Sequence, residues 1–212
     1  EFYNELANNP EHPKTSQPTP GDFRRQYQFL QTHYDSIISI HLPHELSGTY
    51  QSALNASKRV DNTKINVVDG LSASVGLGLI VMKAAQLAKA GKKHDEISAI
   101  LPEIISQSSV YLGLKDLSYV VKGGRLPGWV KKVADFLYIR PVLSIKENGS
   151  MGASGVIRGI SNLPEKMSKL VLGKMDPKKS YNISIGHCNI LKDGEKFMEL
   201  IQKGHNEINS IY

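Results

Sequence analysis

Ser47, Gly48 and Thr49 form the sharpest candidate for chemistry in this sequence of 212 residues. They follow a strand-like run at 36–40 and lie where a helix is expected to begin. A helix N-terminus presents unpaired N–H groups and a partial positive charge, so it binds anions readily. Gly48 would let a ligand approach the backbone, and the two hydroxyls would add donors. In the plainer interpretation Ser47 only caps its helix, because Ser is a common N-cap residue.

A hydrolase nucleophile is another interpretation of Ser47. The nucleophile elbow requires Gly two residues on either side of Ser, whereas this sequence has Glu45 and Thr49 there. His41 and His44 are close to Ser47 in the chain, but no Asp is obviously placed to orient either imidazole. A stand-alone phosphatase or hydrolase that acts on an anionic substrate through Ser47 is therefore kept as the alternative function.

Three further features could bind an anion. Thr15 and Ser16 place two hydroxyls in a proline-rich loop, although such loops are usually solvated connections. Arg125 follows two glycines, and its forked cation suits a carboxylate or phosphate unless it is a surface residue after a helix C-cap. Arg158 follows a predicted hairpin and is either an anion ligand or an exposed charge.

Other classes of site have little support in the sequence. The seven histidines include no i, i+4 pair of ligands and Cys188 is the single cysteine, so we expect neither a metal site nor a disulfide framework. One cysteine agrees with a reducing compartment, and we expect a cytoplasmic protein. No apolar run is long enough to cross a bilayer, and no nucleotide-binding, kinase or zinc signature is found, so no cofactor is expected.

The formal net charge of +6 is unevenly distributed. Residues 1–108 contain 10 basic against 11 acidic residues, while residues 109–212 contain 16 against 9. A basic half favours an anionic partner such as a phosphate, a carboxylate or an acidic protein surface. Nucleic acid is not favoured, because no helix carries a stripe of Lys and Arg and aromatic residues make up only 7% of the chain.

The pattern of apolar residues predicts an α/β protein with two domains. Strands near 36–40 and 65–69 alternate with helices, which predicts a parallel sheet with helices on both faces. The second half is expected to contain a hairpin around Asn148-Gly149, because Asn-Gly favours a tight turn. We therefore predict domains at 1–108 and 109–212. Residues 1–8 are expected to be the end of a helix. A second helix is expected to start with Thr19 as its N-cap, Pro20 at its first position and Asp22 at its third. The other expected helices span 46–60, 73–90, 94–107, 116–122, 127–137, 160–173 and 192–203, and further strands are expected at 109–114 and 181–186.

Five motifs in this order resemble the DegV family, and the resemblance covers essentially the whole chain. It implies two α/β domains that hold a long-chain fatty acid at their junction, and many members are acyl-carrying subunits of bacterial fatty acid kinase. An apolar pocket for the tail is expected, with Ile38, Ile40, Leu79 and Phe136 as candidates. The motifs are Pro13-Lys14-Thr15-Ser16-Gln17-Pro18, Leu46-Ser47-Gly48-Thr49-Tyr50-Gln51-Ser52-Ala53, Val67-Val68-Asp69, Gly123-Gly124-Arg125 and Arg140-Pro141-Val142-Leu143.

The resemblance also assigns roles to single residues. Thr15 and Ser47 would donate hydroxyl hydrogen bonds to the fatty-acid carboxylate. Arg125 and Arg158 would lie near the head group, with Arg125 helping to position an acyl phosphate. The supporting residues are Ser16, Gly48 and Thr49. The implied function is that of a carrier rather than an enzyme: it binds a fatty acid and presents the carboxylate to a separate kinase.

The sequence departs from the family pattern at three places. No strand with Thr-Asp-Ser precedes Glu1, and the chain stops at Tyr212 before the usual Gly-rich segment that contains His. We therefore expect both domains to be truncated. In addition, Pro43-His44-Glu45 replaces the small polar residues that normally precede the Leu-Ser-Gly-Thr motif.

Overall fold

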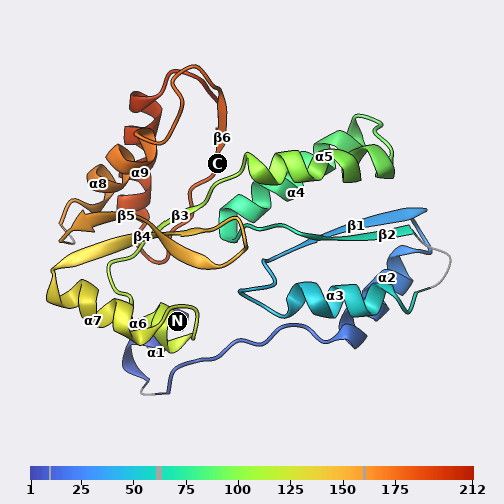
Figure 1. Ribbon diagram of the computed structural model, residues 1–212, viewed down its shortest axis with the longest axis horizontal. Coiled ribbons are helices and arrows are strands. Elements are labelled where there is room, and N and C mark those ends of the chain that lie inside the picture. Colours follow the sequence, from blue (N-terminus) through green and yellow to red (C-terminus); the bar gives the residue numbers. More distant parts are fainter. Residues whose placement is uncertain (10, 61–63, 160) are drawn as a thin grey trace. The chain divides into compact units, whose positions relative to one another are not determined.

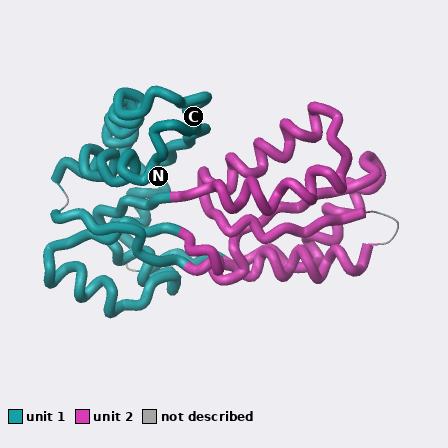
Figure 2. The backbone as a smooth tube through the Cα atoms, turned by 45° about the horizontal axis from the view of Figure 1, so that its top comes forward, with its two compact units in different colours: residues 1–15, 111–144, 151–212 teal, residues 16–110, 145–150 magenta. Residues whose placement is uncertain are grey.

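The chain divides into two compact units, which we describe separately (Figure 2). Unit 2 consists of Ser16–Val110 and Ile145–Ser150, and unit 1 of Glu1–Thr15, Tyr111–Ser144 and Met151–Tyr212. The computed structural model describes residues 1–9, 11–60, 64–159 and 161–212. The chain passes from unit 2 to unit 1 at 110–111, close to the predicted boundary at 108.

Two short segments lie in a different unit from the one that the predicted domain boundaries imply. Residues 1–15 group with unit 1, where the ring of His12 lies 5.8 Å from that of Tyr119. Residues 145–150 group with unit 2, where Gly149 lies against Pro43 and Leu71. Both assignments come from contacts between residues distant in sequence, which a pattern along the chain does not report.

Among its described residues, unit 2 contains a two-stranded parallel sheet and four helices (Figure 1). Strands β1 (Ser36–His41) and β2 (Lys64–Asp69) pair in register, so that His41 lies opposite Asp69 at their carboxyl ends. The predicted strands and their parallel pairing are therefore confirmed. The helices are α2 (Pro20–Leu30), α3 (Thr49–Ser57), α4 (Ser74–Lys89) and α5 (His94–Ser106).

The two faces of this sheet are covered by different helices, as the alternation of side chains along a strand requires. Ile37 points to one face, where it packs with Tyr27 of α2 and Ala53 of α3. Ile38 and Ile40 point to the other face, against the buried residues of α4 and α5. The prediction of helices on both faces is thus confirmed within unit 2. The second cluster contains Ile80, Ala84, Ile97 and Leu101.

Helix α2 begins as its sequence predicts. The side chain of Thr19 accepts a hydrogen bond from the N–H of Asp22 at 3.2 Å, and the Asp22 carboxylate accepts one from the N–H of Thr19 at 2.9 Å. Pro20 occupies the first helical position, where no N–H donor is needed. This capping box anchors the helix directly after the proline-rich loop.

Unit 1 contains a three-stranded sheet in the order β3–β4–β5 and a separate parallel pair, β6–β7. Strand β3 runs antiparallel to β4, and the predicted hairpin joins β4 to β5. Val142 and Leu143 of β4 are fully buried and pack in two different clusters. The strands are β3 (Tyr111–Gly113), β4 (Ile139–Ile145), β5 (Met151–Arg158), β6 (Tyr181–Ile183) and β7 (Ile208–Ile211); the helices are α1 (Phe2–Asn8), α6 (Ser118–Lys122), α7 (Gly128–Phe136), α8 (Leu163–Leu172) and α9 (Leu191–Gly204).

Strand β7 is the element that sequence analysis missed. Its four residues, Ile208 to Ile211, are too few to show a clear period of two. The strand exists because it pairs with β6, where the N–H of Tyr212 donates to the carbonyl of Ile183 at 3.0 Å. A distant partner, rather than local propensity, makes this segment extended.

The turn between β4 and β5 gives a test of the fold. Gly149 has φ +83° and is buried, and an added Cβ would lie 3.1 Å from Pro43 Cβ and 3.3 Å from Leu71 Cδ2. We expect Gly149→Ala to destabilise the protein by about 2 kcal/mol, because backbone strain and crowding add together. Urea unfolding measures the loss.

Gly91 supplies the matched control for this substitution. It has φ +85°, but an added Cβ would meet nothing within 4 Å. Gly91→Ala should therefore cost only the strain of the left-handed backbone, about 1 kcal/mol. Equal losses in the two variants would contradict the packing of the turn on Pro43 and Leu71.

Candidate anion-binding site

The loop that joins β1 to α3 presents the Ser47 and Thr49 hydroxyls together. The N–H groups of Leu46 and Ser47 both donate to the carbonyl of Pro43, at 2.9 and 3.1 Å, which folds the loop into a turn. Helix α3 begins at Thr49 and has Gly48 at its N-cap, so the helix starts later than predicted. Ser47 is therefore not the N-cap residue, although its Oγ accepts the Thr49 N–H at 3.3 Å. The Ser47 and Thr49 hydroxyl oxygens lie 2.8 Å apart.

Gln17 connects the proline-rich loop to this turn. A Cβ added to Gly48 would lie 2.9 Å from Gln17 Nε2 and 3.0 Å from Gln17 Cδ, so the amide packs directly on the glycine. Two of the five motifs thus meet within unit 2, at the start of α3. Gly48 is needed here because a larger residue would occupy the space of the amide.

The remaining predicted ligands lie on other segments. Ser16 is exposed and belongs to unit 2, while Thr15, also exposed, is the last residue of the first segment of unit 1. Arg125 and Arg158 are exposed residues of unit 1. Arg125 follows the glycines that end α6 and donates to the carbonyl of Gly123, and the carbonyl of Arg158 accepts from Lys166. The described contacts therefore bring Ser47, Gly48 and Thr49 together in unit 2.

Asp69, at the end of β2, fixes the other side of the loop. Its Oδ2 accepts from the N–H of His44 at 3.1 Å and lies 2.6 Å from His44 Nδ1, while its Oδ1 accepts from the N–H of Leu71 at 3.0 Å. The hydrogen bond from the imidazole to Asp69 raises the pKa of His44. Glu45 lies on the far side of the ring, with its carboxylate 3.4 Å from His44 Nε2.

The pairing of His44 with Asp69 was missed in the sequence, where no Asp stood near either histidine. The available signal was the parallel pairing of two strand-like runs, because the carboxyl ends of parallel strands meet at one edge of the sheet. That edge carries Asp69 next to the loop that contains His44.

His41 belongs to a separate chain of hydrogen bonds. The Tyr27 hydroxyl donates to Ser39 Oγ at 2.7 Å, and Ser39 Oγ lies 2.7 Å from His41 Nε2. Phe23 packs edge-on against the His41 ring, with centroids 5.1 Å apart. Burial lowers the pKa of His41, so the neutral ring is favoured. These contacts give His41 a structural role on the α2 side of the sheet.

The hydrolase alternative requires a hydrogen bond between Ser47 and a base. In the part of the chain that the structure describes, Ser47 Oγ is bonded to Thr49, while His44 faces Asp69 and Glu45. The Asp–His pair therefore exists, but Nε2 of its imidazole faces Glu45 rather than a serine. This arrangement suits anion binding by hydroxyl groups better than nucleophilic catalysis.

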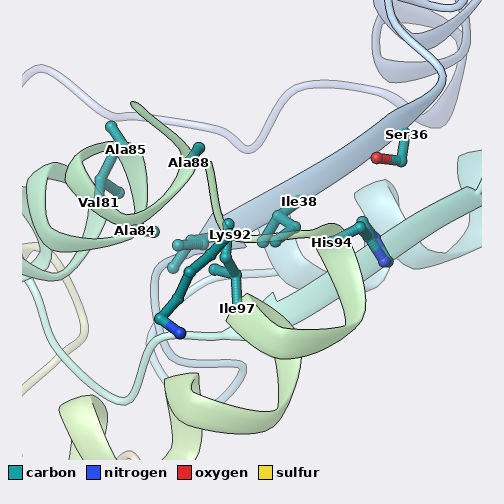
Figure 3. Close-up of a pocket in the computed structure, with 10 residues that line it drawn as sticks. Ser36, Ile38, Val81, Ala84, Ala85, Ala88, Lys92, His94 and Ile97 are labelled. Atoms are coloured by element: carbon teal, nitrogen blue, oxygen red, sulfur yellow. The ribbon is translucent and has the colours of Figure 1, made fainter. Parts of the chain in front are cut away.

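A cavity of about 380 Å³ lies in unit 2 between β1 and helices α4 and α5 (Figure 3). Ile38 and Ile40, two of the predicted tail residues, are part of its lining. Leu79 is not in the lining, and Phe136 belongs to unit 1 with 81% of its surface exposed. The other apolar lining residues are Val81, Ala84, Ala85, Ala88 and Ile97, and the polar ones are Ser36, Lys92 and His94.

Within the described ranges, no group of three or more His, Cys, Asp or Glu side chains could hold a metal ion. None of the described helices is long and apolar enough to cross a membrane.

The family of this chain follows from a family model described as "Uncharacterised protein, DegV family", which matches residues 1–212. The protein belongs to the DegV family. A DegV domain-containing protein of Caldanaerobacter subterraneus subsp. tengcongensis is 33% identical over 159 residues, which cover 75% of this chain and 56% of that protein. A DegV domain-containing protein of Listeria monocytogenes is 28% identical over 212 residues, with coverage of 98% and 74%. The chain thus spans little more than half the length of the first of these relatives.

Solved DegV structures share the fold. A hypothetical protein of Thermotoga maritima, described as revealing a fatty acid binding function, superposes with a TM-score of 0.83 at 26% identity, covering 99% of this chain and 73% of that one. A Thermus thermophilus DegV family protein, described by its fatty acid binding, has a TM-score of 0.79 at 25% identity, with coverage of 98% and 75%. The Streptococcus pneumoniae fatty acid kinase B3 protein loaded with linoleic acid has a TM-score of 0.85 at 22% identity, with coverage of 99% and 74%, and this likeness supports the fold.

The contact between Gln17 and Gly48 can be tested by a double-mutant cycle. We expect Gly48→Ala to cost about 1 kcal/mol, because Ala is a poor N-cap and its Cβ displaces the Gln17 amide. In the Gln17→Ala background, Gly48→Ala should cost less. The coupling free energy between the two positions should be at least about 0.5 kcal/mol. Thermal melts of both single variants and the double variant measure it.

A glycine in α4 provides the control for this cycle. An added Cβ at Gly78 would meet nothing within 4 Å, so Gly78→Ala should be neutral or stabilising by up to about 1 kcal/mol. Strict additivity of Gly48→Ala and Gln17→Ala would argue against the contact between the two motifs.

Proposed function

We propose that the protein binds a long-chain fatty acid and presents its carboxylate to a separate kinase, which phosphorylates it to an acyl phosphate. One observation carries the proposal: the paired hydroxyls of Ser47 and Thr49 at the start of α3, in a chain whose DegV relative from Thermotoga maritima is described as a fatty-acid binder. The protein is accordingly a carrier rather than an enzyme.

The carboxylate binds at the turn before α3 in this proposal. Ser47 donates a hydroxyl hydrogen bond, and Gly48 and Thr49 support it at the positive end of the helix. A neutral donor paired with a charged acceptor contributes roughly 1.5–3 kcal/mol. The DegV resemblance adds Thr15 as the second hydroxyl donor and Ser16, Arg125 and Arg158 as supporting residues.

The apolar tail provides most of the binding free energy in the proposal. Each buried CH₂ group contributes about 0.8 kcal/mol, so a long chain needs a dry apolar surface and few polar contacts. Ile38 and Ile40 are the tail candidates in unit 2, and both line the cavity beside β1. They lie on the strand that leads into the Ser47 loop, so one strand would serve both tail and head group.

The carrier proposal is preferred to the hydrolase alternative for a structural reason. A carrier needs donors for the carboxylate and no base of its own, and among the described residues Ser47 is bonded to Thr49 rather than to a histidine. The excess of basic residues in 109–212 would favour an acidic surface on the kinase or the acyl phosphate itself.

Removal of the two hydroxyl donors tests the head-group assignment. The double variant Thr15→Ala with Ser47→Ala should bind a fluorescent fatty acid at least about tenfold more weakly, since about 1.4 kcal/mol corresponds to a factor of ten. Ser57→Ala is the matched control, because among the described residues the Ser57 hydroxyl donates to the carbonyl of Leu54 in its own helix. The control should bind as the wild type does.

Mass spectrometry of lipid extracted from the denatured protein gives an independent measurement. The wild type and Ser57→Ala should release fatty acid, and the double variant should release less. A folded double variant with unchanged affinity would refute the carboxylate site, and a wild type that neither retains nor binds fatty acid would refute the function.

A further inference from the structure

We propose that His44 is a positioning residue whose proton controls the affinity of the Ser47 loop for an anionic head group. In its protonated form it offsets one of the two negative charges of Asp69 and Glu45 and fastens the loop to β2. In its neutral form it leaves acidic charge beside the loop, and the anion binds more weakly. This inference rests on the proposed function and assigns a pH dependence to the same site.

His44 and Asp69 form a close pair. Asp69 binds His44 twice through one oxygen, at the backbone N–H (3.1 Å) and at Nδ1 (2.6 Å). The Asp69 side chain is only 17% exposed, whereas the imidazole is 52% exposed. The carboxylate is therefore a fixed anchor, and the ring remains open to exchange its proton with solvent.

The position of His44 is linked to that of Ser47. Both residues belong to one turn, closed by the hydrogen bonds from Leu46 and Ser47 to the carbonyl of Pro43. The bond from the His44 backbone to Asp69 therefore also fixes where the Ser47 hydroxyl is presented. The buried turn residue Gly149 also packs on Pro43.

Several titratable and charged groups surround the His44 ring. Glu45 lies on the same loop, Asp69 ends β2, and Tyr50 of α3 has its ring centroid 6.5 Å from that of His44. His41 of β1 lies opposite Asp69 and its pKa is lowered by burial, so its neutral form is favoured. The turn 145–150, which packs on the loop through Gly149, carries Lys146 and Glu147. His44 is thus the imidazole beside both Asp69 and Glu45, and its hydrogen bond to Asp69 raises its pKa.

The sign of the effect follows from these charges. With the proton on, the three groups His44, Asp69 and Glu45 carry a net charge of about −1, and with the proton off about −2. A fatty-acid carboxylate is ionised above about pH 6, so its own charge does not change in this range. Because Asp69 raises the pKa of His44, the affinity should stay high through the usual imidazole range and fall as pH rises beyond it.

The experiment measures binding of a fluorescent fatty acid to the wild type and to His44→Gln from about pH 6 to about pH 9. The wild type should lose affinity by roughly threefold or more across the range, because one positive charge is lost beside the anion. His44→Gln keeps an amide for Asp69 but does not titrate, so its affinity should stay flat. His33→Gln, an exposed histidine on another segment of unit 2, is the matched control and should follow the wild type.

NMR titration of the imidazole signals supplies a measurement that does not require lipid. The His44 signal should titrate at a higher pH in the wild type than in Asp69→Asn, where the charged partner is removed. Parallel binding profiles of the wild type and His44→Gln would overturn the inference while leaving the fatty-acid function intact. A wild type that binds no fatty acid at any pH would overturn the function itself, and the role of His44 in binding with it.

Discussion

The parallel pairing of β1 with β2 is the constraint on which the described site depends. In a parallel pair the carboxyl ends of both strands lie at one edge, and here the register sets His41 opposite Asp69. The loop that follows β1 therefore lies within hydrogen-bonding distance of the end of β2, and Asp69 binds the backbone and ring of His44. Without this register, the Ser47 hydroxyl would have no fixed position relative to the second strand.

Small side chains let this pair of strands support helices on both faces. Ala53 and Ala56 of α3 are completely buried, so this helix packs closely on the sheet. The helix begins directly after the Ser47 loop. Ile38 and Ile40 point to the opposite face, where Ala84 of α4 is also buried. The cavity beside β1 follows from this composition, because alanine leaves space that a larger residue would fill.

Two sets of polar side chains in unit 2 differ in their burial and in their roles. Tyr27, Ser39 and His41 bond to one another on the α2 face, which satisfies them in a partly buried setting and favours a neutral ring. His44 and Asp69 lie at the edge of the sheet, where the imidazole is open to solvent. Burial makes the first group structural. Exposure allows the second group to exchange protons.

The sequence by itself determined the elements and the chemistry of the loop. Runs of β-branched residues predicted β1 and β2, and Thr19 and Asp22 predicted the start of α2. The segment Ser47-Gly48-Thr49 predicted hydroxyl donors at a helix start. These signals are local, so the sequence contains them. The tertiary structure alone decided the pairing of His44 with Asp69, the contact of Gln17 with Gly48, and strand β7. Each of these contacts joins residues far apart in the chain. The periodicity of a segment does not show which distant segment it will pair with or pack against.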